Sequence, residues 1–471
     1  MIRLMLCLLA LPLGLAFAQD TGGFTVTQNS FKDLFNKHRI AQPKITPWAG
    51  DFFPYSSHGT SIKLNRDGDP ASNGTSPMQS YGKLARIGDA AHDWEKANHS
   101  CDHLRGELRQ SCMGWWGHCN GWAAAAIKEL EPRKPVTASG VELSVADQKG
   151  IFTELWLSSA SLNAGWTDKS KVTGKWVHDH DRPTEAYRRF WDVSPRTFFL
   201  IFTNYIGALK TGVVIDRFTG DEVWNQPMVG YRMLPIRKSD IKEVREGNRS
   251  YWSALIRVKI FWANDLGTPA GHISAPFDIN KIKDNEDVEH LGRDYEGRYL
   301  AFRLNFDRAL EMAPDGKTVV NAGRMIGDGI WEHQENSRDY ADLSLNETHP
   351  DFIWLPTDPI QDETGYGNPY MDHRVTSRIS RAGPTPPASA AQELKLVFAP
   401  RAFGGAPLDA ETVKKAVQRV LRREGIRNAI YLDSIEISRS RVLVPVRFPQ
   451  GADQSALVQL FAAAAMDVRI Q

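Results

Sequence analysis

The sequence of 471 residues predicts an α+β fold, in which a helix carrying a cysteine packs on an antiparallel sheet. A Gly- and Trp-rich loop runs into an alanine-rich stretch at Cys119–Leu130, and alanine strongly favours helix. From residue 197 to residue 306, short apolar, β-branched and aromatic segments alternate with turns, which is typical of antiparallel strands. A small module follows at the C-terminus, beyond a segment rich in Pro and Ala.

Composition and charge limit the possible functions. The formal net charge is +1, so nothing in the electrostatics favours a nucleic acid or an anionic membrane as partner. Hydrophobic residues make up 42% and charged residues 24% of the chain, as in ordinary globular proteins. The length predicts two to three domains.

The N-terminus has the pattern of a secretory signal peptide over residues 1–18. A short basic start ends at Arg3, an apolar run covers Leu4–Leu15, and the small-x-small triplet Ala16–Ala18 precedes the expected cleavage after Ala18. The apolar run is too short to span a bilayer. We therefore expect a secreted or periplasmic protein with no membrane span after cleavage, beginning with a polar lead-in at residues 19–45.

Export makes the cysteine count informative. Cys7 leaves with the signal peptide, so an odd number of cysteines remains in an oxidising compartment. Cys101 and Cys112 bracket a short polar segment that a disulfide closes easily. Cys119 is then left over, and a leftover thiol in an exported protein is either an intermolecular link or a reactive group.

The position of Cys119 favours the reactive interpretation. Cys119 stands where the Gly- and Trp-rich loop becomes helix, and the first turn of a helix presents unpaired N–H groups and a positive dipole end. Such a position lowers the pKa of a thiol and offers donors for an oxyanion. The alternative is a small buried core cysteine. Helical spacing also predicts helices at residues 77–100 and 144–160, before and after this one.

Strands are predicted downstream of these helices. Residues 197–203 form an apolar and aromatic run, and a second strand at residues 213–216 ends in a carboxylate, Asp216. Asp216 can orient a catalytic base, or it can simply begin the turn that follows its strand. Further strands are expected at residues 223–227, 253–262 and 299–306.

The C-terminal part reads as a separate unit. Residues 384–392 form a Pro- and Ala-rich linker after a main domain at residues 46–383. Residues 393–471 then follow the order βαββαβ, which is typical of a ferredoxin-like module. Nothing in this module looks catalytic, so we interpret it as an accessory domain that docks to a partner the sequence does not identify.

Six short motifs give the main domain a family resemblance that spans roughly Thr46 to Pro356. The first surrounds the cysteine (Gly117–Ala123), and the last is the segment His349–Trp354. Between them lie the Ala146-Asp147-x-Lys149-Gly150 helix, the Asn204–Gly207 turn, the Val214-x-Asp216-Arg217 strand end and the Trp224-Asn225-Gln226-Pro227 segment. Together and in this order, they resemble the elicitor-type transglutaminase family of oomycete cell walls.

The resemblance implies a papain/transglutaminase-like core and a cysteine acyltransferase activity. Cys119 would attack the side-chain amide of a protein glutamine, and a lysine amine of a second protein or peptide would capture the thioester. The expected partners are therefore glutamine- and lysine-bearing substrates. The chemistry requires no cofactor, although the family is associated with calcium. No metal-ligand set is assigned from the sequence.

The same motifs suggest which other side chains form the site. Asp216 is the candidate orienting carboxylate, and we expect an oxyanion and substrate cleft to be lined by residues near the cysteine and on the following strand. These residues are Trp116, His118, Asn120, Trp122, Trp224 and Asn225.

The catalytic base is the point at which this sequence departs from the family. Members tend to carry a histidine on the strand before the Asn204–Gly207 turn, whereas Phe199 occupies that place here. Loops could bring His178, His180 or His272 to the cysteine instead, and His180 is the candidate base. Two alternatives stay open: a pseudo-enzyme that acts as a binding or scaffold protein, because of Phe199, and a cysteine amidase or peptidase in which water replaces the lysine.

Overall fold

The structure is a computed structural model of the chain, and it describes most of the main domain and parts of the C-terminal segment. In the main domain it describes residues 24–102, 112–164, 193–216, 223–265, 269–286, 291–332, 350, 352–359 and 367–382. In the C-terminal segment it describes residues 391–398, 409–423, 430–431, 435–438, 442–449, 454–463, 466 and 468–470. The predicted signal peptide (residues 1–18) and His180 lie outside the described residues.

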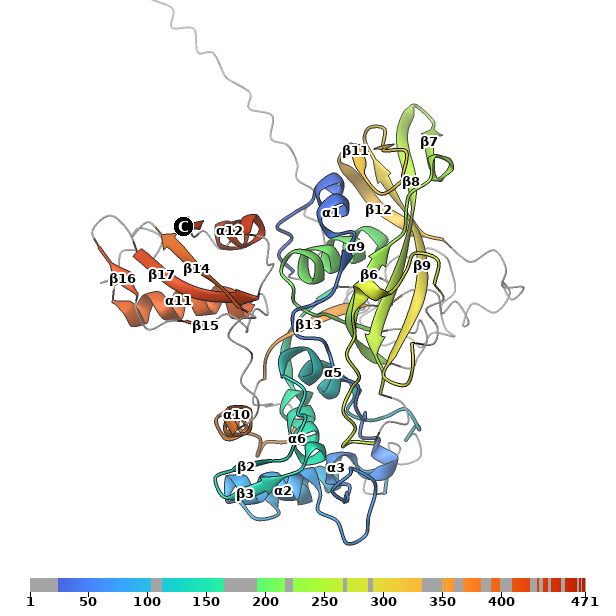
Figure 1. Cartoon of the computed structure of the whole chain (residues 1–471). Coiled ribbons are helices and arrows are strands. Elements are labelled where there is room, and N and C mark those ends of the chain that lie inside the picture. Colours follow the sequence, from blue (N-terminus) through green and yellow to red (C-terminus); the bar gives the residue numbers. More distant parts are fainter. Residues whose placement is uncertain are drawn as a thin grey trace, which may run out of the picture.

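A large antiparallel sheet forms the framework of the main domain (Figure 1). Along the sheet, the strand order is β12 (Met325–Trp331), β9 (Tyr295–Phe306), β8 (Arg249–Ala263), β6 (Asn225–Met233), β5 (Val214–Asp216), β13 (Ile353–Pro359) and β4 (Ser159–Ala164). Two strands pair off this path, β1 (Ile40–Ala41) with β6 and β7 (Ile241–Glu246) with β8. Each pairing is antiparallel, so the predicted α+β class is confirmed.

One predicted strand is a helix. The apolar run at residues 197–203 belongs to α9 (Pro195–Phe202), which continues into a π-helical turn, η5 (Thr203–Ala208). The helix begins because the Ser194 side chain accepts a hydrogen bond from the Thr197 N–H and Pro195 occupies the first turn, where its missing N–H costs nothing. Residues 198–202 are apolar on every side of the helix, and all of them are buried.

Phe199 therefore has a different setting from the one predicted. Its ring lies 5.4 Å from that of Phe31 on α1 (Phe31–His38) and 5.7 Å from that of Phe202, in the hydrophobic core. Since Phe199 stands on a core helix, the expectation that it occupies the place of a base on a strand is wrong.

The cysteine-bearing helix α5 (Cys119–Lys128) packs closely on α6 (Val145–Leu157). The alanines Ala123–Ala126 are completely buried, and small side chains allow the two helix axes to approach. Gly121 sits at the contact, where an added Cβ would lie 2.4 Å from the Thr153 carbonyl oxygen. The alanine-rich composition that predicts the helix thus also fixes its packing.

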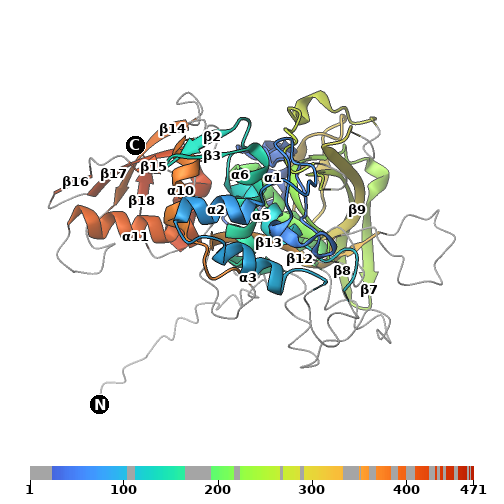
Figure 2. The same ribbon diagram turned by 90° about the horizontal axis from the view of Figure 1, so that it is seen from below.

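Two shorter helices replace the single helix predicted over residues 77–100. They are α2 (Pro77–Ala85), which packs on α6, and α3 (Ala90–Asn98), as Figure 2 shows. The chain breaks between them because Arg86 is left-handed (φ +61°) and Gly88 follows with φ +62°. The domain also contains the hairpins β2 (Val136–Ala138) with β3 (Val141–Leu143) and β10 (Glu311–Met312) with β11 (Val319–Asn321), and the helix α10 (His373–Ala382).

The C-terminal segment forms its own sheet, with strands in the order β15-β17-β14-β18 (Figure 1). In chain order the elements are β14 (Ala391–Phe398), α11 (Ala410–Arg423), β15 (Ile430–Tyr431), β16 (Glu436–Ile437), β17 (Val442–Pro449), α12 (Gln454–Ala463) and β18 (Val468–Ile470). The observed order, βαβββαβ, has one short strand more than the expected βαββαβ, and the assignment to the ferredoxin-like fold stays a prediction. Ala391 and Gln392, expected in the linker, belong to β14.

None of the described helices is long and apolar enough to cross a membrane.

Candidate active site

Cys119 is the first residue of α5, as the sequence predicts, and His118 is the residue that caps the helix. The Cys119 side chain is buried, with 7% of the residue exposed. Its thiol donates to the Val223 carbonyl oxygen at 3.6 Å, and its sulfur accepts a hydrogen bond from Asn225 Nδ2 at 3.5 Å. The helix start thus meets the beginning of strand β6.

The sheet brings Asn225 and Asp216 to the same place. They are direct cross-strand partners on β6 and β5. Asn225 Oδ1 accepts a hydrogen bond from Trp354 Nε1 on β13 at 2.8 Å, which fixes the amide with its NH₂ toward the sulfur. Asp216 Oδ1 accepts from the Trp224 N–H at 2.9 Å. Cys119, Asn225 and Trp354, far apart in the sequence, therefore form one hydrogen-bonded chain.

The electrostatics of Cys119 are opposite to the expectation. Burial raises the pKa of the Cys119 thiol to about 11, the hydrogen bonds from Asn225 oppose this, and the carboxylates of Asp265 and Asp216 raise it further. The helix start does not compensate for the loss of water around the sulfur. In this conformation the group is a thiol at neutral pH.

Apart from Asn225, described above, the expected cleft residues fall into two groups, half-buried and fully buried. Trp116, Asn120 and Trp224 are half-buried, and the Asn120 amide donates to the Leu157 carbonyl oxygen at 3.2 Å. His118 and Trp122 have no exposed surface, so neither lines an open cleft. Trp122 is a core residue of α5, and His118 points into the polar cluster described below.

No imidazole reaches the Cys119 sulfur among the residues that the structure describes, where its polar partners are Val223 and Asn225. His272 lies elsewhere, with its Nε2 2.6 Å from Asp294 Oδ1. His180, the candidate base, belongs to the segment at residues 165–192, which lies outside the described residues.

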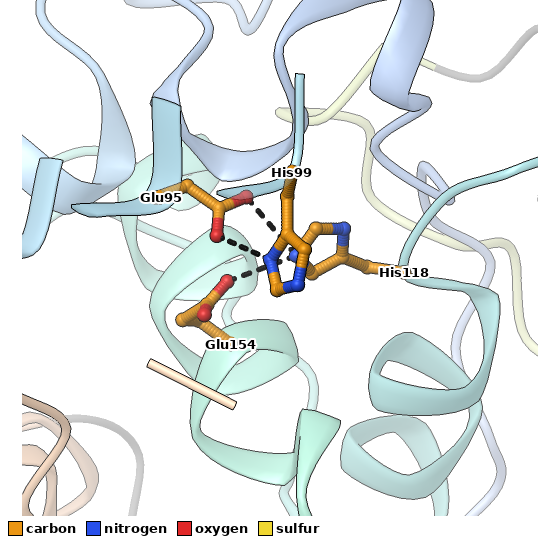
Figure 3. Close-up of side chains that lie close together, drawn as sticks. All are labelled: Glu95, His99, His118 and Glu154. Atoms are coloured by element: carbon orange, nitrogen blue, oxygen red, sulfur yellow. Dashed lines mark hydrogen bonds and ion pairs between the residues drawn. The ribbon is translucent and has the colours of Figure 1, made fainter. Parts of the chain in front are cut away.

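Behind Cys119, four buried polar side chains meet, and Figure 3 shows them pointing toward one another. We call Glu95, His99, His118 and Glu154 the buried cluster. His118 Nε2 lies 3.0 Å from Glu95 Oε1 and 3.1 Å from Glu154 Oε2. His99 Nδ1 lies 2.7 Å from Glu95 Oε2.

The backbone and side chain of Thr60 complete the surroundings of the buried cluster. The Thr60 N–H donates to Glu95 Oε1 at 3.0 Å, and its hydroxyl donates to Glu154 Oε2 at 2.7 Å. The preceding Gly59 has φ +55°, and an added Cβ would lie 2.2 Å from Glu95 Oε1. Only glycine allows the backbone to pass this close to the carboxylate.

The negative charge of Glu95 and the positive charge of His118 stabilise each other. Burial would lower the pKa of His118, but the carboxylates of Glu95 and Glu154 raise it to about 10. Burial would raise the pKa of Glu95, but His118 and then His99 lower it to about 2. The side chains of the buried cluster alone cause these two pKa shifts.

The sequence interpretation missed Glu95, His99 and Glu154. One signal was present, because Glu95 and His99 are four residues apart on a predicted helix and such residues share one face. No signal in the sequence places His118 and Glu154 beside them, since these come from α5 and α6.

The predicted disulfide is confirmed. Cys101 and Cys112 are bonded, with their Cα atoms 5.8 Å apart, and Cys119 is the free cysteine of the described chain. The Cys101 N–H donates to the Tyr55 carbonyl oxygen at 3.0 Å, and the Trp116 carbonyl oxygen accepts from the Tyr55 N–H at 2.8 Å. Tyr55 thereby bonds the chain on both sides of the disulfide.

Calcium, which the family resemblance implies, does not fit the buried cluster. Among the described residues, this cluster is the group of His, Cys, Asp and Glu side chains that could hold a metal. Half of its members are imidazoles, whereas calcium takes six to eight oxygen ligands. The loop at Asn65–Asp69 is an internally bonded turn, because Asn65 Oδ1 accepts from the N–H groups of Asp67 and Asp69.

Two comparisons with known proteins found a match. The chain is similar to the crystal structure of the GP42 transglutaminase from Phytophthora sojae, at 17% identity and a TM-score of 0.46, over 76% of this chain and 93% of that chain. No curated protein matches. Residues 71–254, which contain the disulfide, the buried cluster, Cys119 and Asp216, match the family model "Transglutaminase elicitor". This match confirms that the family predicted from the sequence, the elicitor-type transglutaminases, is the one to which this central part of the chain belongs.

Proposed function

We propose that the protein is an exported cysteine acyltransferase of the transglutaminase type, with Cys119 as nucleophile. The observation that carries the proposal is the hydrogen-bonded chain from Trp354 through Asn225 to the Cys119 sulfur at the start of α5. It positions a thiol and an amide donor side by side, as acyl transfer through a thioester requires. The family match and the disulfide support this assignment and an oxidising location.

In the proposed reaction, the Cys119 sulfur attacks the side-chain carbonyl carbon of a glutamine. The carbon–nitrogen bond breaks, the amide nitrogen takes the thiol proton and leaves as ammonia, and a thioester remains. A lysine amine then attacks the thioester, which forms the isopeptide bond and returns the proton to the sulfur. Asn225 Nδ2 and the first-turn N–H groups of α5 are the donors proposed for the developing oxyanion.

The proton of the thiol has to leave through a base before or during attack. His180 is our candidate, with Asp216 as its orienting carboxylate. Because the pKa of the buried thiol is about 11, attack at neutral pH requires a base of this kind at the sulfur. Replacing His180 with glutamine should therefore lower the rate about 10²–10⁴-fold.

Incorporation of a labelled primary amine into a glutamine-rich protein tests the proposal. We expect incorporation by the mature chain and none by Cys119→Ala, with Arg66→Ala as a matched control at an exposed ion pair with Glu142. Equal incorporation by the mature chain and Cys119→Ala would contradict the proposal. Ammonia release without incorporation would indicate the amidase or peptidase alternative.

A second candidate function has its own observation in favour. The Cys119 thiol is buried, protonated at neutral pH, and without an imidazole partner among the described residues. A pseudo-enzyme that uses the fold as a binding scaffold would keep such a thiol. This alternative predicts neither ammonia release nor amine incorporation with any glutamine substrate, at full folding of the protein.

A further inference from the structure

We propose that the buried cluster of Glu95, His99, His118 and Glu154 is a structural site for a divalent first-row transition metal, with zinc as the ion it fits best. The four ligand atoms lie within 4.8 Å of one another. Two imidazoles and two carboxylates are ligands that zinc commonly accepts, and four protein ligands complete a structural site.

Unpaired polar atoms point to a missing partner. Glu154 Oε1 is buried and accepts no hydrogen bond from the described residues. His118 Nε2 has two carboxylate oxygens within 3.1 Å, yet neither lies in a direction suitable for a hydrogen bond from that nitrogen. Buried polar atoms without partners are rare and need an explanation.

A bound metal explains this geometry. In a tetrahedral zinc site with bonds of about 2.0–2.1 Å, neighbouring ligand atoms lie about 3.3 Å apart. The lone pair of each ligand atom points at the metal, so it does not point at the neighbouring ligand atoms. The separations of 3.0 Å and 3.1 Å between His118 Nε2 and the two carboxylate oxygens are close to this value. Oxygens that share a metal with the nitrogen need not accept a hydrogen bond from it.

The charge also balances around a divalent ion. Two carboxylates contribute two negative charges, and two neutral imidazoles contribute none, so one divalent ion makes the site neutral. A neutral site is the less costly arrangement for side chains that are 0–5% exposed.

Complete burial makes the role structural rather than catalytic. Catalytic zinc sites keep one position open to water or substrate, whereas this cluster offers no exposed ligand. The metal would tie α3, α6 and the first turn of α5 together. Since His118 directly precedes Cys119, the site would fix the start of the helix that presents the proposed nucleophile.

Metal analysis of the full mature chain tests the inference. We expect about one zinc per chain after purification, its removal by a strong chelator, and a lower melting temperature that returns on adding zinc. Cobalt added to the metal-free protein should give the visible spectrum of a four-coordinate site with nitrogen and oxygen ligands. A metal-free protein that neither binds zinc one-to-one nor melts at a different temperature with zinc would overturn the inference and leave an ion-pair network.

Single variants locate the site. Glu154→Gln should weaken zinc binding by about 100-fold or more, because even changes outside the ligand set cost 10–100-fold. His92→Gln is the matched control, since His92 lies on α3 beside Glu95 but bonds Ser76 Oγ at 2.8 Å. Equal zinc affinity in Glu154→Gln and the parent would contradict the assignment. If Glu154→Gln does not fold, the cobalt spectrum of the unaltered chain decides, and thiolate-to-cobalt absorption would place the metal on Cys119 instead.

Discussion

His118 and Cys119 are neighbours in the sequence and differ in almost every physical respect. His118 faces the buried cluster, where two carboxylates lie within 3.1 Å and stabilise a positive charge. Cys119 faces the sheet, where Asn225 donates to its sulfur and the carboxylates of Asp265 and Asp216 raise the pKa of its thiol. One side of the helix start is thus built to hold a cation, whereas the other side opposes an anion.

The comparison shows that position at a helix start does not by itself activate a thiol. The dipole of a helix is worth about 0.3–1 kcal/mol at its end, whereas burial of a charge costs several kcal/mol. The imidazole that could have stabilised a thiolate, His118, is next in the chain but points to the other side and is occupied by Glu95 and Glu154. Activation of Cys119 therefore depends on a group other than His118.

The largest expected difference between the two neighbours is in stability. His118→Gln should lower the free energy of unfolding by about 3–5 kcal/mol, because it leaves two buried carboxylates without their cationic partner or metal. Cys119→Ala should cost about 1 kcal/mol, since it removes one small side chain. Denaturant unfolding of both variants measures this. A loss below about 1 kcal/mol for His118→Gln would mean that the buried cluster contributes little.

Alkylation of Cys119 sharpens the electrostatic side of the comparison. Since the pKa of the thiol is about 11, the rate with iodoacetamide should still rise about tenfold per pH unit between pH 7 and pH 9.5. An unperturbed thiol would level off near pH 8.5. Mass spectrometry of the free cysteine follows the reaction, with a short cysteine peptide as control. A plateau already below pH 7 would show that the site activates its thiol without substrate.

Asp51 gives a pH effect that belongs to neither neighbour. Its segment contacts His118, because the Phe52 carbonyl oxygen accepts a hydrogen bond from the His118 backbone N–H at 2.6 Å. Burial raises the pKa of Asp51 to about 6, and the Phe53 N–H opposes this. A carboxyl with a raised folded pKa stabilises the fold while protonated, below about pH 4, and loses this as the pH rises through about 6.

Replacing Asp51 with asparagine should remove that dependence. Allowing for the partial exposure of Asp51, we expect the variant to be more stable than the parent by up to about 2 kcal/mol at pH 7.5 and equal to it at pH 4. Asparagine keeps an oxygen that can accept from Phe53 N–H, so the local turn is preserved. Melting curves at both pH values measure the effect. A constant difference across pH would show that Asp51 does not titrate in this range.

The smallest effect concerns the hydrogen bond that orients Asn225. Trp354→Phe removes the donor to Asn225 Oδ1 and should cost about 1 kcal/mol of stability. In the proposed reaction it should lower kcat with little change in KM, because the misoriented amide no longer serves the transition state. Trp331→Phe is a matched control, since Trp331 Nε1 donates to the Val193 carbonyl oxygen in another part of the domain. Equal losses of kcat in both variants would argue against a role for Trp354 in positioning.

Local patterns predicted many of the elements. The alanine run predicts α5, helical spacing predicts α6, and apolar, β-branched segments predict β8 and β9. The error at α9 has a local cause as well, because a short apolar run does not distinguish a buried helix from a buried strand. The Ser194-Pro195 start was the signal that favours helix there.

The candidate site was only partly predictable, for reasons of distance along the chain. Cys119 and Asp216 follow from local context and family motifs. The contact between Cys119 and Asn225 joins residues 106 positions apart, and that between Asn225 and Trp354 joins residues 129 positions apart. Such contacts depend on which strands become neighbours in the sheet, and no local pattern specifies this.

By itself, the sequence determined the α+β class, the start of the helix at Cys119, the Cys101–Cys112 disulfide and the family of residues 71–254. These depend on backbone preference, cysteine count and short motifs, all of which are local. Only the tertiary structure decided the protonation of Cys119, the burial of His118 and the meeting of Glu95, His99 and Glu154 around it. A pKa and a ligand set depend on the distance to water and to charges on other elements, and packing alone fixes those distances.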